Sequence, residues 1–130
     1  MESSEVKIVF RILGDGLSSE LSSLLNGING KLVEKGYAFP NSGKVNDVDY
    51  WEFETPYEAC EDVEECLLDG LSWLLGSNVG KALAGSGYEL FLDIVLRLDK
   101  DHIPSFSLEN ETVAQLGQLG VCIDVDISLD

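Results

Sequence analysis

The sequence has no basic residue between Lys44 and Lys81, although its 130 residues include 8 Lys and Arg against 24 Asp and Glu. Negative charge is densest in the first part of this stretch, where the acidic residues are Asp47, Asp49, Glu52, Glu54, Glu58, Glu61, Asp62, Glu64, Glu65 and Asp69. Like charges one helical turn apart destabilise a helix by about 0.2–0.5 kcal/mol per pair, and a partner's Lys and Arg would relieve that cost. The block therefore predicts a surface for a basic partner; the alternative is a solvated face that only favours solubility.

Long apolar runs and basic clusters are also missing. No apolar run approaches the ~20 residues of a membrane helix, so a membrane-spanning protein is excluded. Eight scattered bases do not supply the Lys/Arg footprint that phosphate contacts need, which argues against direct nucleic-acid binding. The acidic start of the chain, residues 1–5, lacks the basic and apolar regions of a signal peptide, so we expect a cytoplasmic location.

The sequence has little of the chemistry that enzymes and metal sites use. Its three cysteines contain no CxxC pair, and Cys60 and Cys66, six apart on a predicted helix, are expected on different sides of it as inert thiols. The single histidine, His102, has no nucleophile motif to serve. We therefore predict no catalytic, cofactor-binding or metal-binding residue, and no enzyme.

Two segments resemble ligand loops without meeting their requirements. Residues 76–82 are one residue short of a phosphate loop, and Ala82 stands where Ser or Thr would bind Mg²⁺. The segment that begins at Asp99 has Pro104 where a calcium loop needs glycine. Both segments are expected to be ordinary turns or helix ends.

Hydrophobic periodicity predicts one α+β domain over residues 1–130. Apolar and polar residues alternate in segments 5–13, 50–54, 88–98 and 121–127, which predicts strands that each bury one side, and a short strand is expected at 105–108. Helices are expected after Ser18 or Ser19, from Thr55 to about residue 75, in a short piece up to residue 84, and at 110–120, with 29–48 as a long excursion. The resulting fold is a two-layer sandwich, a mostly antiparallel sheet with helices on one face.

The predicted strands and the long helix place the candidate binding residues. Thr55, Pro56 and Glu58 form the pattern of a helix start with a capping box. The candidate partner-binding residues are Glu52, Glu54, Tyr57, Glu61, Asp62, Glu65 and Asp69. Trp51, Tyr57 and Trp73 are candidate apolar anchors, and Trp73 is the one expected in the core. On the open face, Lys7 and Arg11 would lie near Asp93, Asp124 and Asp126 if the outer strands are neighbours.

Several segments resemble a known family in their order along the chain. They are 9–15 (VFRILGD), 50–52 (YWE), 88–96 (YELFLDIVL), 104–108 (PSFSL), and the helix and strand of 116–119 and 121–127. This order resembles the small bacterial proteins grouped as domain of unknown function 4279, a family that implies no catalytic residues. In size and charge the chain also resembles the immunity proteins of bacterial toxin systems, including contact-dependent growth inhibition.

These observations lead us to expect a non-enzymatic immunity protein that binds and neutralises a cognate basic toxin domain, with a nuclease as the expected class, because nuclease clefts carry the basic residues that hold phosphates. Complementary charge would accelerate the encounter and select the right partner. The alternative is a small-ligand-binding or subunit domain whose acidity serves solubility alone. A third interpretation, an acidic mimic of DNA, predicts binding to many nucleic-acid-binding proteins.

Overall fold

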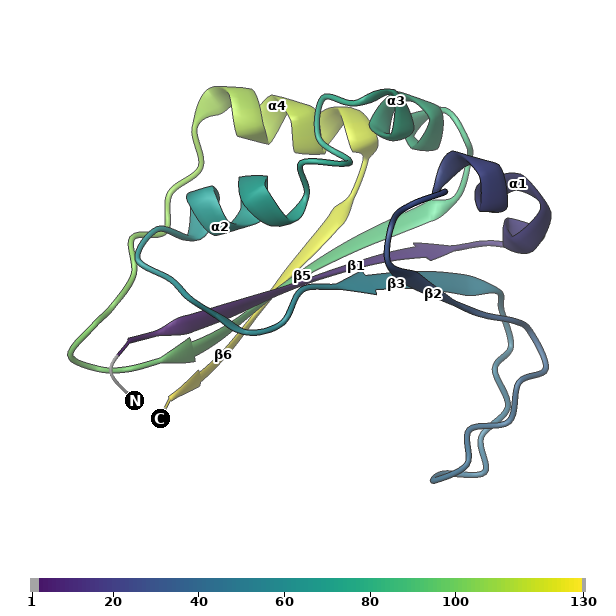
Figure 1. Ribbon diagram of the computed structural model, residues 1–130, viewed down its shortest axis with the longest axis horizontal. Coiled ribbons are helices and arrows are strands. Elements are labelled where there is room, and N and C mark those ends of the chain that lie inside the picture. The colour runs from purple at the N-terminus through teal and green to yellow at the C-terminus, as the bar shows by residue number, and fades with distance from the viewer. Residues whose placement is uncertain (1–2, 130) are drawn as a thin grey trace.

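The computed structural model describes residues 3–129, with the backbone alone for residues 18–20. Its elements in chain order are β1 (Glu5–Leu13), α1 (Leu17–Leu24), β2 (Gly30–Val33), β3 (Tyr50–Glu54), β4 (Glu58–Ala59), α2 (Val63–Gly70), α3 (Asn78–Ala84), β5 (Glu89–Leu98), α4 (Asn110–Leu119) and β6 (Cys122–Leu129). The strands form one sheet in the order β2-β3-β1-β5-β6, and β4 pairs with β1 beyond the end of β3. All pairings are antiparallel except that of β5 with β6. The helices lie on one face of this sheet (Figure 1), which confirms the predicted α+β fold.

The core lies between the sheet and the helices. Ile8, Phe10 and Ile12 of β1 are buried on the helix-covered side, as the alternation of segment 5–13 predicted. The helix layer contributes Leu67 and Leu71, which are fully buried. Removing side chains of this size from water stabilises the fold by about 1.5–3 kcal/mol each.

Trp73 is the centre of a cluster of four aromatic rings that packs against this core. Its ring meets those of Phe10, Trp51 and Phe53 edge to face, with centroid distances of 5.8, 5.7 and 5.2 Å. Edge-to-face pairs add about 0.5–1.5 kcal/mol beyond the area that they bury. Trp73 is therefore half-buried against the core, where it was expected, and Trp51, which is buried, is not available as a surface anchor.

The helix predicted from Thr55 begins later, at Val63, and Asp62 is its N-cap. The Asp62 carboxylate accepts a hydrogen bond from the backbone N–H of Glu64 at 3.0 Å. Thr55 is instead bound to β1, because its hydroxyl accepts from the N–H of Ile8 and its own N–H donates to the Ile8 carbonyl, both at 2.9 Å. Glu58 pairs with Val6 in β4, so the predicted capping box does not form.

Two further expectations differ from the structure. The segment 29–48 contains a strand, β2, which pairs with β3 before the chain projects from the sheet as a hairpin closed by a bridge between Ala38 and Val45 (Figure 1). The strand predicted at 105–108 is reduced to one bridge between Ser105 and Asp62. Both differences depend on long-range pairing, which local alternation does not report.

Candidate partner-binding site

The predicted binding residues lie on two opposite sides of the sheet. Glu52 and Glu54 of β3 are on the open face, where basic residues of β1 bind them. Arg11 Nε donates to Glu52 Oε2 at 2.8 Å, and Lys7 Nζ lies 3.1 Å from Glu54 Oε2. The hydrogen bond to Glu52 is the largest of the effects that raise the pKa of the Arg11 guanidinium. These two carboxylates are therefore already neutralised within the chain.

Tyr57 also belongs to the open face. The Arg97 guanidinium carbon lies 3.5 Å from the centroid of its ring, and Lys7 Nζ lies 5.5 Å from it. Cation–π contacts of this kind contribute about 0.5–1 kcal/mol at exposed sites. The ring is thus held by the chain's own cations and not among the acidic residues of α2.

The remaining predicted residues gather on and around α2. Glu61, Glu65 and Asp69 are exposed, and no cation forms an ion pair with them within residues 3–129. Asp62 differs from them because its carboxylate caps the helix. Unpaired carboxylates at helical spacing repel one another, so this surface has the uncompensated charge that a basic partner could neutralise.

A groove of about 370 Å³ runs between α2 and the strands. Its lining is more polar than apolar: Val6 and Ile8 are buried beneath it, Phe53 is half-buried, and three acidic residues line it: Glu54, Glu58 and Asp69. Lys and Arg side chains place their aliphatic stems on apolar surface and keep the charged group at the edge. Glu58 and Asp69 line the groove without an ion-pair partner among residues 3–129, whereas Glu54 is already bound to Lys7.

The thiol of Cys66 lines the same groove and responds to its charge. Burial is the main cause that raises the pKa of this thiol, and the hydrogen bond with Cys60 opposes the increase. Three carboxylates add to the increase through their negative charge: Glu58, Glu65 and Asp69. The negative charges of these carboxylates therefore reach the Cys66 thiol, although burial has the larger effect on its pKa.

Cys60 and Cys66 contact each other, contrary to the expectation that they occupy different sides of one helix. Their sulfur atoms are 3.3 Å apart, because Cys60 lies before α2 and the chain turns at Asp62. Burial raises the pKa of the Cys60 thiol to about 12, and the neighbouring Cys66 thiol adds to the shift. A thiol of this kind stays protonated near neutral pH and reacts slowly.

Two exposed apolar side chains beside the acidic surface were not predicted. Leu68 of α2 follows the buried Leu67 and is exposed, as is Phe106. The loop of Phe106 is fixed to the start of α2, because Ser105 N–H donates to the Glu61 carbonyl at 2.8 Å and Val63 N–H donates to the Ser105 carbonyl at 2.9 Å. An apolar residue in the segment PSFSL is the sequence signal that could have indicated Phe106.

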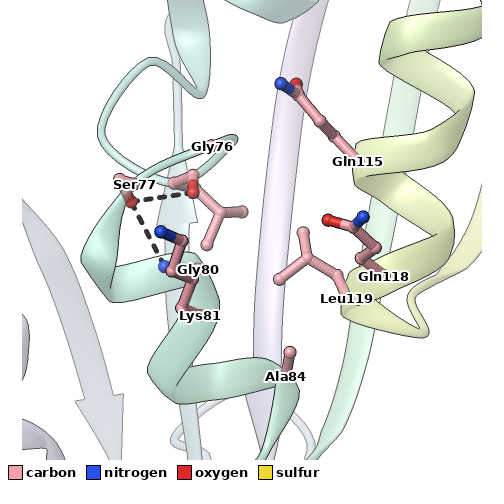
Figure 2. Close-up of a pocket in the computed structure, with 9 residues that line it drawn as sticks. Gly76, Ser77, Gly80, Lys81, Ala84, Gln115, Gln118 and Leu119 are labelled. Carbon is pink, nitrogen blue, oxygen red and sulfur yellow. Dashed lines mark hydrogen bonds between the residues drawn. The ribbon is translucent and has the colours of Figure 1, made fainter.

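A second, smaller cavity of about 210 Å³ lies between α3 and α4. Gln115 and Gln118 of α4 line it opposite Gly80 and Lys81 of α3 (Figure 2). The hydroxyl of Ser77 is committed to the backbone, since it donates toward the Leu74 carbonyl at 2.8 Å and accepts from Gly80 N–H at 3.2 Å. The polar groups left to meet a ligand are Lys81 and the two glutamines.

Within the described part of the chain, no three His, Cys, Asp or Glu side chains are grouped as metal ligands would be. Among residues 3–129, no helix has the length and apolar character needed to cross a membrane.

The fold defines an α+β protein with a mostly antiparallel sheet, helices on one face and an acidic groove beside α2. The chain belongs to the family described as Domain of unknown function (DUF4279), whose model matches residues 4–130. This match confirms the family resemblance predicted from the sequence, whereas a relationship to immunity proteins stays a proposal. No match was found among curated proteins or among solved structures.

Proposed function

We propose that this protein is a non-enzymatic immunity protein of the bacterial cytoplasm that binds and neutralises a basic toxin domain, with a nuclease as the class of toxin. The observation that supports the proposal is the groove beside α2, which contains the half-buried Phe53 and two carboxylates, Glu58 and Asp69, that no cation of residues 3–129 neutralises. A basic side chain of the toxin would enter this groove. Glu65, exposed on α2, and Glu61, exposed directly before its N-cap, would attract further Lys and Arg residues.

Affinity in this proposal comes from apolar contacts, and the charges supply rate and selectivity. A few desolvated residues carry most of the energy of typical interfaces, whereas charges at the rim mainly accelerate the encounter. Leu68 and Phe106 are the exposed apolar residues next to the acidic surface, so they replace the buried Trp51 as the proposed anchors. Covering a phosphate-binding cleft with carboxylates would exclude nucleic acid from it.

The experiment that tests this function is co-purification with the polypeptide encoded immediately upstream. The tagged protein and that polypeptide are expressed together and purified at low and then at high salt. A stoichiometric complex that survives high salt, and a loss of toxicity that requires the complex, are expected. A complex that salt dissolves completely, or none, contradicts the proposal, because a specific interface keeps apolar contacts that salt does not screen.

A second candidate function is small-ligand binding, and the cavity between α3 and α4 favours it. Lys81 and two glutamines over an apolar wall would suit a small carboxylate. Ligand pockets usually have volumes of about 300–1,000 Å³, so this one admits only a small molecule. The test is a thermal-shift screen of small carboxylates, with Lys81→Met as the variant that should lose the response.

A further inference from the structure

β6 is exposed along its whole length. Each of its residues from Cys122 to Leu129 is exposed, although the strand pairs with β5 over eight positions. β6 is the last strand of the sheet, so its outer backbone edge has no neighbouring strand within residues 3–129 (Figure 1). Edges of this kind present unpaired N–H and C=O groups that can accept another strand.

The apolar row of the core continues onto β6 but is no longer covered there. In the β5–β6 register, Ile123, Val125 and Ile127 pair with Leu92, Ile94 and Leu96. The β5 residues are 1%, 1% and 3% exposed, whereas the β6 residues are 41%, 43% and 60% exposed. Soluble proteins usually protect such an edge with Lys, Pro or a bulge. Residues 122–129 contain neither lysine nor proline.

The open face of the same edge carries excess negative charge. Asp124 pairs with Asp93 in the register, and Asp126 follows on the same face. Arg11 is the cation of this cluster, with Nη1 3.9 Å from Asp93 Oδ2, and Asp93 Oδ1 is buried without a hydrogen-bond partner among the described residues. Burial, a hydrogen bond with Asp126 and the nearby negative charges together raise the pKa of Asp93. Arg11 is already bound to Glu52 at 2.8 Å, and neither Asp124 nor Asp126 forms an ion pair within residues 3–129.

We propose that β6 accepts a strand from a partner protein, and that this strand alternates Lys or Arg with branched apolar residues. The basic side chains would lie beside Asp124 and Asp126, and the apolar side chains would extend the row of Ile123, Val125 and Ile127. Main-chain hydrogen bonds give affinity in strand addition, and the alternating side chains give specificity. The inference does not depend on the partner being a toxin, because it concerns the edge of the sheet and not the acidic groove beside α2.

A second copy of the chain fits this edge poorly. Two β6 strands paired in antiparallel with matching faces would place Asp124 and Asp126 of one copy against the same residues of the other. Like charges opposite one another destabilise a strand pair, and each copy has a net charge of -16. A basic strand places positive charges opposite Asp124 and Asp126 and does not bring a second large negative charge.

The probe for the test is a synthetic eight-residue peptide that alternates lysine and valine. Its affinity for the full chain is measured by fluorescence anisotropy, and the protection of the β6 amides is measured by hydrogen exchange. The control peptide has the same composition in two blocks, four lysines followed by four valines. It has equal charge but cannot present one basic and one apolar face as a strand.

Two pairs of variants localise the binding. Ile127→Lys places a charge in the apolar row, and Val45→Lys is its control, because Val45 is 62% exposed on the distant hairpin. Asp124→Asn with Asp126→Asn removes charge without changing side-chain shape. Its control, Asp15→Asn with Asp47→Asn, removes the same charge from other exposed positions.

The alternating peptide is expected to bind and to protect the β6 amides. Ile127→Lys should weaken binding about tenfold, and the double Asn variant of β6 about fivefold at low salt, while both controls stay within about twofold. Equal binding of the block peptide would overturn the proposal. So would equal losses in a variant and its control, or a dimer joined through β6 in sedimentation experiments. If Ile127→Lys does not fold, the Asp124→Asn and Asp126→Asn double variant and its control still test the proposal.

Discussion

At the scale of single residues, Gly30 is required by the aromatic ring beside it. A Cβ at position 30 would overlap the indole of Trp51, which is packed against Trp73 and would have to shift. Gly30→Ala is therefore expected to destabilise the fold by about 1–3 kcal/mol, the usual cost of overpacking. Urea unfolding followed by tryptophan fluorescence measures this change.

The same substitution should have the opposite effect at Gly117. This glycine lies within α4, and a Cβ there would meet no atom within 4 Å. Alanine stabilises a helix interior by about 0.8–1 kcal/mol relative to glycine. A Gly30→Ala variant as stable as the wild type would contradict the packing of Trp51 against Gly30, and a destabilised Gly117→Ala would contradict the open space beside Gly117.

The cysteines differ in reactivity for physical reasons that can be tested separately. Cys60 is buried with a pKa of about 12, whereas Cys122 is exposed on β6. At pH 8 we expect iodoacetamide to modify Cys122 readily and Cys60 only after unfolding, because the thiolate is the reactive form. Peptide mapping by mass spectrometry, with and without denaturant, gives the rates. Rapid labelling of Cys60 in the folded protein would contradict its burial.

At the scale of elements, the start of α2 depends on Asp62. Asp62→Ala is expected to destabilise the protein by about 1 kcal/mol, because it removes the side chain that caps the helix. Asp62→Asn should cost much less, since asparagine caps nearly as well. Thermal unfolding of the two variants separates capping from charge. Equal losses would show that the charge, and not the cap, is what the helix requires.

Because β5 pairs with β6, Asp93 lies beside Asp126, and we expect the ionisation of Asp93 to lower the stability of the protein as pH rises. Burial and the hydrogen bond with Asp126 raise its pKa in the folded state, so ionisation of Asp93 costs stability. That cost is fully present above the raised pKa and disappears as pH falls towards the ordinary value of 3.8. Asp93→Asn should therefore stabilise the protein at pH 7 and gain progressively less towards pH 4.

Urea unfolding of the wild type and Asp93→Asn at several pH values tests this sign. Asp93 faces Arg11 as well as Asp124 and Asp126, and the loss of the Arg11 contact acts against the gain. A destabilised Asp93→Asn at pH 7 would mean that the pairing with Arg11 outweighs burial. If Asp93→Asn were more stable than the wild type by the same amount at every pH, ionisation of the Asp93 carboxylate would not be the cause of the difference.

The predicted helices and strands agree with the structure where local pattern decides them and differ where contacts between distant residues decide them. Alternation predicted β1, β3 and β5, because it records which side of a strand is buried. It also predicted a strand with one buried side at 121–127; the strand is present as β6, but every one of its residues is exposed, so the predicted burial was wrong. The start of α2 was misplaced, since Thr55 and Pro56 form a local helix signal while the hydrogen bonds of Thr55 come from Ile8, 47 residues away. β2 was missed because a short, mostly exposed strand has no buried side to create alternation.

The candidate site could be predicted only in part for the same reason. Helical spacing correctly predicted that Glu61, Glu65 and Asp69 are exposed on α2 or directly before it. The neutralisation of Glu52 and Glu54 depends on the register of β1 with β3, which the sequence does not specify. The exposure of Leu68 and Phe106 depends on which helix covers which strand, so it became visible only in three dimensions.

At the scale of the whole molecule, negative charge is distributed unevenly. The basic residues Lys7, Arg11 and Arg97 lie on the open face, where they neutralise the carboxylates of β3 and hold Tyr57. The helix side around α2 and the edge at β6 keep uncompensated carboxylates. Partners that approach this protein would therefore be steered towards these two regions at low salt.

The central claim is that the acidic surface of α2 recognises a basic partner, and charge reversal tests it most directly. The reversed variant carries Glu61→Lys, Glu65→Lys and Asp69→Lys and leaves the cap Asp62 intact. The control carries Asp15→Lys, Glu34→Lys and Asp101→Lys at exposed positions elsewhere. Each triple variant changes the net charge from -16 to -10, since every substitution adds two positive charges.

The measurement is the rate of association with the upstream-encoded polypeptide, by stopped-flow fluorescence over a range of salt concentrations. The reversed variant should associate at least about tenfold more slowly at low salt and depend less on salt, whereas the control stays within about twofold of the wild type. Equal rates for the two variants, whether both are slow or both unchanged, would contradict recognition through α2.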